Sequence, residues 1–516
     1  MSTLYRNGHV YSAASPHASA LLVDGDRIRF VGSEDAADGC LADEVVDLGG
    51  ALVTPAFVDA HVHTTAAGLA LDGLDLARCT DRTHLLGAVE RQVAIRPGPV
   101  IGHGWDDTSW TDRRLPTAIE LDRASGGVSV YLSRVDKHSA LVSSALMAAV
   151  EDLADLAGFD PDGRLTREAH HAVRDRAFAA LTPTQRTAAQ RATRAAAAAA
   201  GIGALHECGG PTISSEDDFT GLLALAVAEP GPEVYGYWAE LNAAAKARDL
   251  GAVGAGGDLF ADGALGSHTA SLRASYADRE TSGQSYLDGH QVAEHLVDCV
   301  RNGVQGGFHA IGDRALHTVV LEGFAAAAGV VGVEALRAGR HRVEHAEMAD
   351  AALIRGMVEY GVVASVQPAF DAAWGGAAGM YAQRLGVDRA LTLNPFAAMA
   401  NVGVPLAFGS DAPVTPLDPW GTVKAATSHR NPRHALPVRA AFAAHTRGGW
   451  RAMGRDDEGM LAVGAPATFA VWATEELVAS GPVADRLPDL GDGAPRPTCL
   501  RTVVRGLTVH ALEGVR

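Results

Sequence analysis

The sequence predicts an α/β fold: a (β/α)8 barrel with a small β-sandwich domain built from both termini and a helical insertion after the first barrel strand. Two observations carry this prediction. In the middle of the chain, short apolar segments that end in polar residues alternate with Ala/Leu-rich helical stretches. At both ends, short β-type runs are separated by glycine-containing turns. Repeated strand–helix units indicate a parallel sheet, and eight of them favour a closed barrel.

The two ends of the chain share one type of pattern. "SALLVDGDRIRFVGS" places apolar runs around an Asp-Gly turn, and "ATFAVWA" and "CLRTVVRGLTVHA" near the C-terminus are also short β-type runs. We therefore expect residues 1–55 and 457–516 to form one composite β-domain, with residues 56–456 forming the barrel.

Eight segments are candidates for the barrel strands. Each has an apolar body and polar residues at its C-terminal end, where such barrels carry their chemistry. In chain order they are "AFVDAHVH", "IGALHECGG", "EVYGYWAE", "GGDLFADGALG", "QGGFHAIGD", "HRVEHAE", "GVVASVQPA" and "VPLAFGSDAP". The gap between the first two is too long for a single crossover. Residues 65–200 are therefore predicted to be an inserted, mostly helical lid segment that covers the mouth of the barrel.

Composition restricts the partners. The formal net charge is -18, so the protein is expected to repel nucleic acid and acidic membrane surfaces. No segment approaches about 18 consecutive apolar residues, so no membrane span is expected. The 5 cysteines are scattered and lack CxxC pairing, which indicates reduced thiols in the cytoplasm. The expected partner is a small-molecule substrate, and a homodimer is left open.

"FVDAHVHTTAAG" contains His61 and His63 at a spacing that suits a metal site. Residues i and i+2 of a strand point to the same face, so both imidazoles would project into the barrel mouth, with Asp59 on the same face. In a chain with 21 histidines, one such pair can also arise by chance. The context decides, because three more ligand-type residues end other candidate strands: His309, His345 and Asp411. Neutral imidazoles with a carboxylate suit zinc, iron or manganese.

Several segments resemble the signature blocks of the amidohydrolase superfamily. They are "PAFVDAHVH", "DGALGSHTASL", "FHAIGDRAL", "HRVEHAE", "SVQP" and "FGSDAPV", in the family's order. "GHGWDD" and "DKHSALVSSAL" resemble the branch that contains N-substituted formamide deformylase. The resemblance implies a divalent-metal site, with zinc as the first expectation, made from His61, His63, His309, His345 and Asp411.

One position departs from the family pattern. Many members carry a carboxylated lysine on strand four that bridges two metals, and the matching position here is Asp258. Because an aspartate is several bonds shorter than a carboxylated lysine, we expect it not to span the same gap, and one ion is favoured. Glu207, at the end of the second strand, is a rival candidate for a substitute ligand, although an ion-pair or strand-end role is at least as plausible.

The resemblance implies hydrolysis of a non-peptide C–N bond in an amide, an N-substituted formamide or a cyclic amide, through a metal-activated water. Asp411 is expected to act as general base and His345 to stabilise the charge that builds on the carbonyl oxygen, with His309 a plain ligand. Two alternatives stay open: deamination of a heterocycle at the same site, and a catalytically inactive homologue that binds a metal or a small molecule.

Five residues are candidates for substrate contacts, each with a structural alternative. Trp105 and Asp106 in the insertion could close over the pocket, or Trp105 could be a packing residue. His138 could donate a hydrogen bond to the substrate, or be a structural histidine. Asp313 could orient His309 or cap a helix, and Gln367 could reach the pocket. Three other histidines carry no functional prediction: His170 and His171, expected on an exposed helix face, and His206, expected in the core or at a strand end.

Overall fold

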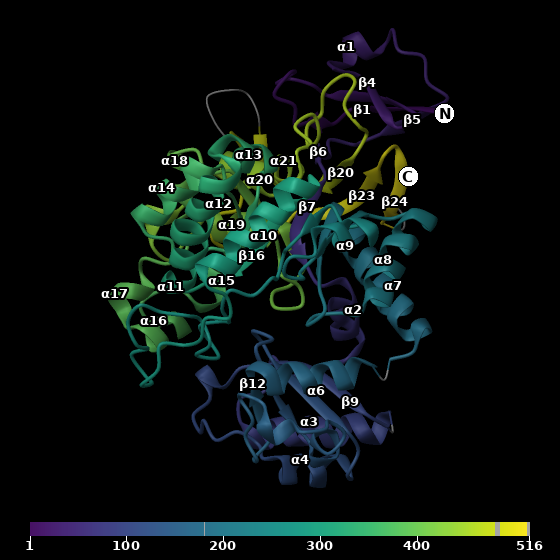
Figure 1. Ribbon diagram of the computed structural model, residues 1–516. Helices are drawn as coiled ribbons and strands as arrows, with labels where there is room; N and C mark the ends of the chain where they lie inside the picture. The colour runs from purple at the N-terminus through teal and green to yellow at the C-terminus, as the bar shows by residue number, and fades with distance from the viewer. Residues whose placement is uncertain (97, 180, 480–485, 513–516) are drawn as a thin grey trace.

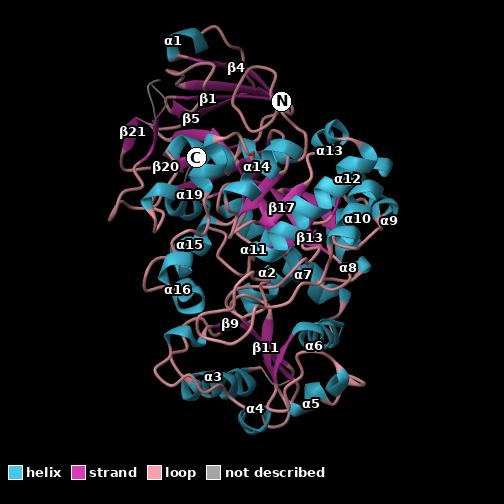
Figure 2. Cartoon of the chain, turned by 60° about the vertical axis from the view of Figure 1, so that its left-hand side comes forward, coloured by secondary structure: helices cyan, strands magenta, loops and turns pink. Residues whose placement is uncertain are grey.

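The computed structural model describes residues 1–96, 98–179, 181–479 and 486–512. The chain forms three parts, which Figure 1 shows one above the other: sheets from both termini at the top, a barrel in the middle and the insertion at the bottom. The turned view in Figure 2 keeps the same order, so the terminal sheets and the insertion lie at opposite ends of the barrel.

The barrel is a single parallel sheet of 8 strands. Its strands are β7 (Phe57–Val62), β13 (Ile202–Gly209), β14 (Glu233–Trp238), β15 (Gly254–Ala255), β16 (Gln305–Ala310), β17 (Arg342–His345), β18 (Val363–Val366) and β19 (Leu406–Phe408). Each pairs in parallel with its neighbours, and a parallel bridge between Val62 and Ala412 joins the last strand region to the first. The predicted (β/α)8 barrel is confirmed.

Helices follow the barrel strands and cover the outside of the sheet (Figure 2). They include α8 (Glu216–Ala228), α9 (Ala244–Asp249), α10 (Gly289–Asn302), α12 (Phe324–Val331), α13 (Val333–Gly339), α14 (Ala351–Tyr360), α15 (Pro368–Trp374), α16 (Met380–Leu385), α17 (Val387–Ala390), α18 (Phe396–Asn401), α19 (Pro419–Thr427), α20 (Val438–Ala444) and α21 (Arg447–Ala452). Helix α10 shows why they form locally. Asp288 and Gln291 make a reciprocal capping box at its start, and Gly303 ends it in the left-handed conformation.

One outer helical stretch, Asp313–Val331, is long and apolar enough to cross a membrane by length and composition, with mean hydropathy 1.3. It consists of α11 (Asp313–Leu316), the π-helical segment η3 (His317–Gly323) and α12. In the fold it lies between β16 and β17, and its Val319, Val320 and Phe324 side chains are fully buried in the main hydrophobic core. Packing against the barrel therefore accounts for these buried apolar residues.

Both termini build the sheets at the top of Figure 1. One sheet has the order β4 (Arg27–Gly32), β3 (Ala20–Asp24), β1 (Ser2–Arg6), β5 (Glu44–Asp47), and helix α1 (Glu34–Ala37) connects β4 to β5. The other has the order β2 (His9–Val10), β6 (Leu52–Pro55), β20 (Phe469–Ala473), β23 (Thr498–Val504), β24 (Leu507–Ala511). One cluster of buried side chains joins the two sheets, among them Tyr5, Leu21, Val53 and Phe469. A two-stranded sheet of β21 (Leu477–Ala479) and β22 (Arg486–Pro488) completes this end.

The insertion contains the expected helices and also a 5-stranded sheet that we did not predict. The helices are α2 (Thr64–Asp72), α3 (Arg82–Ile95), the 3-10 turn η1 (Asp107–Ser109), α4 (Ala118–Ser125), α5 (Ser144–Met147), the 3-10 turn η2 (Leu153–Asp155), α6 (Arg167–Ala179) and α7 (Pro183–Ala199). The strands are β8 (Leu74–Asp75), β9 (Val100–Trp105), β10 (Val130–Arg134), β11 (Ser139–Val142) and β12 (Arg164–Thr166). Every residue of β10 and β11 is buried, so these strands lack the polar–apolar alternation that distinguishes a strand from a short helical segment.

Candidate metal centre

Six side chains from five parts of the barrel meet at the C-terminal mouth of the sheet. His61 is the penultimate residue of β7 and His63 follows this strand, His309 lies on β16, His345 ends β17, and Asp411 follows β19. The five predicted metal-site residues therefore share one neighbourhood. His63 Nε2 is 3.2 Å from Asp411 Oδ1, and the His309 and His345 rings are 4.4 Å apart between centroids. The sixth member is Asp258, which follows β15.

Asp258 lies among all four histidines. Its Oδ2 is 3.1 Å from His63 Nε2 and its Oδ1 is 3.2 Å from His309 Nδ1. The same Oδ1 lies 3.5 Å from Nε2 of both His61 and His345. Asp258 therefore reaches the centre, although its side chain is shorter than a carboxylated lysine.

The backbone conformation before Asp258 brings this short side chain to the centre. Strand β15 ends at Ala255, and the next two residues, Gly256 and Gly257, have φ of +151° and +77°. A Cβ atom on Gly256 would stand 2.3 Å from the Gly307 backbone nitrogen. Glycine thus allows the chain to approach β16 and turn towards the barrel axis, and this bend carries Asp258 inward.

Three of the imidazoles are oriented through their other ring nitrogen. His61 Nδ1 is 2.9 Å from Glu344 Oε2, and His345 Nδ1 is 2.9 Å from Gln367 Oε1. His63 Nδ1 is 2.9 Å from the Cys208 carbonyl oxygen. These contacts direct each Nε2 towards the centre of the site, as the outer partners of metal-binding histidines do.

Glu344 links this centre to a buried charge pair. The Arg342 Nε donates to Glu344 Oε1 at 2.8 Å, and both side chains are completely buried. Burial alone would raise the pKa of Glu344, but the charge of Arg342 and the contact with His61 outweigh it and lower that pKa to about 2. Glu344 is therefore a carboxylate at neutral pH, fixed to accept a hydrogen bond from His61.

The donor set fits a divalent cation. Nε2 of His61, Nε2 of His345 and Oδ1 of Asp411 are buried polar atoms without a hydrogen-bond partner among the described residues. Leaving such atoms unsatisfied is costly, and a cation is the partner that imidazole nitrogens and carboxylate oxygens share. Two triads have ligand atoms within 4.8 Å of one another, and His61 belongs to both: His61, Asp258, His345 and His61, His63, Asp411.

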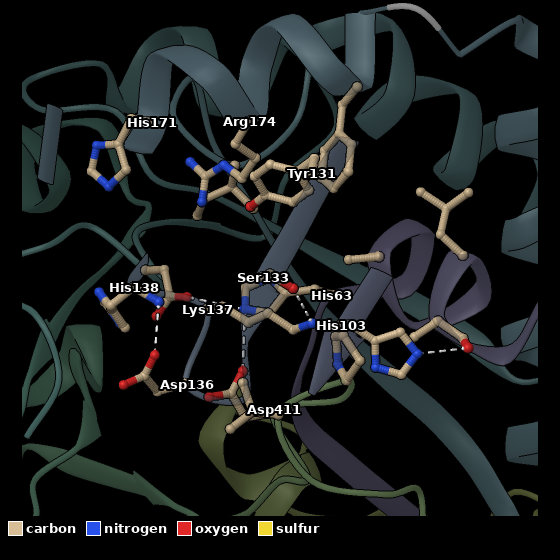
Figure 3. Close-up of a pocket in the computed structure, with 18 of the residues that line it drawn as sticks. His63, His103, Tyr131, Ser133, Asp136, Lys137, His138, His171, Arg174 and Asp411 are labelled. Atoms are coloured by element: carbon tan, nitrogen blue, oxygen red, sulfur yellow. Dashed lines mark hydrogen bonds and ion pairs between the residues drawn. The ribbon is translucent and has the colours of Figure 1, made fainter. Parts of the chain in front are cut away.

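A cavity of about 90 Å³ opens directly onto this centre. His63, Asp258, His309, His345 and Asp411 form its floor, and Figure 3 shows part of this region with side chains from the insertion. The insertion contributes residues of α2, β9, β10, the turn after β10 and α6, among them Leu69, Ile101, Ser133, Lys137, His138, His171, Arg174 and Phe178. The insertion thus closes one side of the cavity.

Three basic side chains of the insertion face this cavity with altered protonation. Burial lowers the pKa of His138 to about 4 and that of His171 to about 3, so both imidazoles are neutral at pH 7. Burial also lowers the pKa of Lys137 to about 7, although the nearby Asp411 charge opposes this shift. His138 lies beside the centre, because its ring centroid is 5.3 Å from that of His309.

Two predicted substrate contacts in the insertion are corrected by the structure. Trp105 is completely buried in the insertion's own core, and its Nε1 donates to the Leu132 carbonyl at 2.9 Å. Asp106 accepts a 2.7 Å hydrogen bond from Arg134 Nη2 and caps the turn at Thr108. Neither side chain lines the cavity. Their positions are explained by packing and ion pairing within the insertion, which the sequence pattern could not separate from a pocket role.

Three further barrel candidates lie outside this cavity. Gln367 touches His345 and not the cavity. Asp313 accepts from the Arg273 backbone nitrogen at 2.9 Å and neither orients His309 nor caps the helix. Glu207 accepts from the Thr64 backbone nitrogen at 2.7 Å, and so satisfies the start of α2 instead of binding in the centre.

Several residues of the site were missed by sequence reasoning. His170 and His171 are not on an exposed helix face: His170 is completely buried against the Tyr131 hydroxyl, and His171 lines the cavity. Glu344 stands two residues after Arg342 on a buried strand, and this Arg-x-Glu spacing was the available signal. For Lys137 the signal was its place beside His138. No sequence feature of Arg174 distinguished it from a residue on a solvated helix face.

The barrel gathers imidazoles and carboxylates at its mouth, and the insertion closes one side of the cavity there. This combination of fold and site defines a class of barrel hydrolases. A model of the amidohydrolase family matches residues 44–510, and the chain belongs to that family. The resemblance predicted from the motifs is therefore confirmed.

Individual relatives cover most or part of the chain. YtcJ of Bacillus subtilis is 26% identical over 91% of this chain and 94% of its own length. N-substituted formamide deformylase of Arthrobacter pascens is 32% identical over 30% of this chain and 29% of that protein. The solved structure of an uncharacterized metal-dependent hydrolase from Pyrococcus horikoshii has a TM-score of 0.71 at 22% identity, covering 91% of this chain and 97% of that one. It shows the same fold.

Proposed function

We propose that the protein is a metal-dependent hydrolase that cleaves a non-peptide C–N bond in a small amide, formamide or cyclic amide. The observation that carries this proposal is the convergence of four imidazoles and two carboxylates at the barrel mouth, where five of these six side chains line one cavity. Membership of the amidohydrolase family supports hydrolysis of amide-type bonds in general. The name of the Arthrobacter relative supports the narrower choice of a C–N bond outside a peptide.

The proposed cofactor is one divalent cation, with zinc as the best match to nitrogen and oxygen ligands. His61, His63, His345, Asp411 and Asp258 would hold it. Both candidate triads use His61, whose Nδ1 is already occupied by Glu344, so they overlap at a single nitrogen. This overlap supports one ion over two separate ones.

The bound cation supplies Lewis-acid chemistry, which lowers the pKa of a water molecule and polarises a carbonyl group. The chain's own residues do the proton work. Asp411 lines the cavity, so its carboxylate can accept a proton from water and pass it to the leaving nitrogen. His138 is neutral at pH 7 and lies beside His309, where it can donate a hydrogen bond to the substrate.

The test combines metal content with turnover. We expect about one equivalent of divalent metal in the purified protein and release of amine or acid from a panel of amides and N-formyl compounds. Ammonia release from a heterocyclic base would instead identify a deaminase. Asp411→Asn is expected to lower kcat by at least about a hundredfold while most of the metal stays bound. Unchanged turnover in this variant would remove Asp411 from the mechanism.

A further inference from the structure

Two basic side chains of the insertion line the cavity with part of their hydrogen-bonding capacity unused. Lys137 lies in the turn between β10 and β11, and Arg174 lies on α6. In Figure 3, Arg174 and Tyr131 are drawn above, Asp411 below, and Lys137 between them. The proposed reaction uses neither side chain.

Arg174 is a buried guanidinium with unmet hydrogen-bonding capacity. Its side chain is 11% exposed, and its Nε and Nη2 are buried without a hydrogen-bond partner in the described part of the chain. Asp175 Oδ1 is 3.8 Å from Nε, a long ion-pair contact that is beyond hydrogen-bonding distance. A buried, unpaired charge is unfavourable unless a partner of opposite charge completes it.

Lys137 is also incompletely paired. Its ammonium donates to Ser133 Oγ at 2.9 Å, which uses one of three donors. Within the ranges that the structure describes, no carboxylate lies within 4.0 Å of its Nζ. The neighbouring Asp136 is occupied by Arg134 at 2.8 Å and Ser267 at 2.8 Å. Lys137 also holds φ at +60°, a conformation that is unfavourable for a lysine and is retained only where the surroundings impose it.

Apolar residues line another part of the cavity. They come from α2, β9, α6 and the segment after β13: Leu69, Ala70, Ile101, Phe178 and Ile213. A ligand that matches both features has an apolar body with an anionic group. A carboxylate suits the two cations, since it accepts from an ammonium and from a guanidinium at once.

We propose that Lys137 and Arg174 form a carboxylate subsite, so the substrate is an acidic amide whose carboxylate is not part of the bond that is cleaved. This inference rests on the proposed hydrolase function and narrows its substrate class. The apolar body of the substrate packs between α2 and α6, and the amide lies on the floor of the cavity. The carboxylate then acts as the positioning group.

The first experiment compares two substrates that differ only in the carboxylate. N-formylphenylalanine has it, and N-formylphenethylamine lacks it. We expect kcat/KM to favour the acid by about ten- to a hundredfold, the worth of one or two hydrogen bonds to charged groups. Lys137→Asn removes the cation and tolerates a positive φ, and Arg174→Gln removes the other cation. Each is expected to reduce the preference about tenfold, whereas Arg174→Lys keeps part of it.

The second experiment measures binding without turnover. Phenylacetate and the neutral benzyl methyl ketone are titrated into the metal-loaded protein by calorimetry. We expect tighter binding of phenylacetate, and loss of that difference in Lys137→Asn and Arg174→Gln. Arg176→Gln, an exposed position on the same helix, is the matched control and should leave it unchanged. Melting temperatures of all variants show whether they fold.

The outcomes separate the two proposals. A preference for phenylacetate that survives in both variants means that the carboxylate binds the metal, and it overturns the subsite. Equal binding of both probes overturns it as well. If no amide or formamide is hydrolysed while phenylacetate binding still depends on both cations, the hydrolase proposal fails and the subsite stands. If amides are hydrolysed without any preference for the acid, the hydrolase proposal stands and the subsite proposal fails.

Discussion

Asp258→Asn is the sharpest perturbation of the candidate metal centre. Asparagine keeps the size of the side chain and one carbonyl oxygen, but it removes the negative charge. Asp258 is buried and lies 3.1 Å from His63 Nε2 and 3.2 Å from His309 Nδ1. If Asp258 is a ligand, the substitution weakens metal binding by far more than a change at the surface would.

The expected magnitude follows from these contacts. An interaction with a charged partner contributes about 1.5–3 kcal/mol, so two carboxylate contacts correspond to about 3–6 kcal/mol. With 1.4 kcal/mol per factor of ten, metal affinity should fall by about a hundred- to ten-thousandfold. Burial makes screening by solvent small, which favours the upper part of this range.

Competition with a chromophoric chelator measures the affinity, and elemental analysis measures the metal content. Asp313→Asn is the matched control, because that carboxylate binds the Arg273 backbone away from the centre, and it should retain the wild-type affinity. If Asp258→Asn kept the wild-type affinity and stoichiometry, Asp258 would not be a ligand and our interpretation of its position would be refuted.

Three further predictions test the surroundings of the site. Glu344→Gln should lower metal affinity about ten- to a hundredfold in the chelator assay and cost about 3 kcal/mol of unfolding free energy, because it leaves Arg342 buried without its carboxylate; unchanged affinity would remove its orienting role. Trp105→Ala should lower the unfolding free energy by about 3–5 kcal/mol in urea melts, yet leave KM unchanged at urea concentrations below the transition. A raised KM would show that Trp105 does contribute to substrate binding. Burial lowers the pKa of His341 to about 4, below its unfolded value near 6.5. Between these pH values the unfolded state binds more protons, so stability falls as the pH drops from about 6.5 to about 4. His341→Asn should flatten the pH dependence of the melting temperature, and an unaltered slope would contradict this.

The barrel and most of its centre could be predicted because parallel strands align their C-terminal ends. A histidine or aspartate near the end of an apolar strand therefore lies at the mouth of the barrel. This rule holds for His61, His309, His345 and Asp411. The place of Asp258 in the centre could not be predicted in this way, because it depends on two glycines with positive φ and not on side-chain length alone.

Residues that act through tertiary contacts could not be assigned from their own segments. Glu344 acquires its role because β17 faces β7 across the barrel, which places it against His61. Trp105 resembles a pocket residue in its motif, but the unpredicted sheet of the insertion encloses it. Arg174 and Lys137 meet the cavity only because α6 and the turn after β10 are folded over the barrel mouth.

The most direct test of the account is anomalous diffraction at the zinc edge from crystals of the full chain grown with zinc. We predict one strong peak at the mouth of the barrel, within bonding distance of Asp258 and of ring nitrogens from His61 and His63. A peak elsewhere, or no peak in crystals grown with excess zinc, would contradict a metal centre at this position.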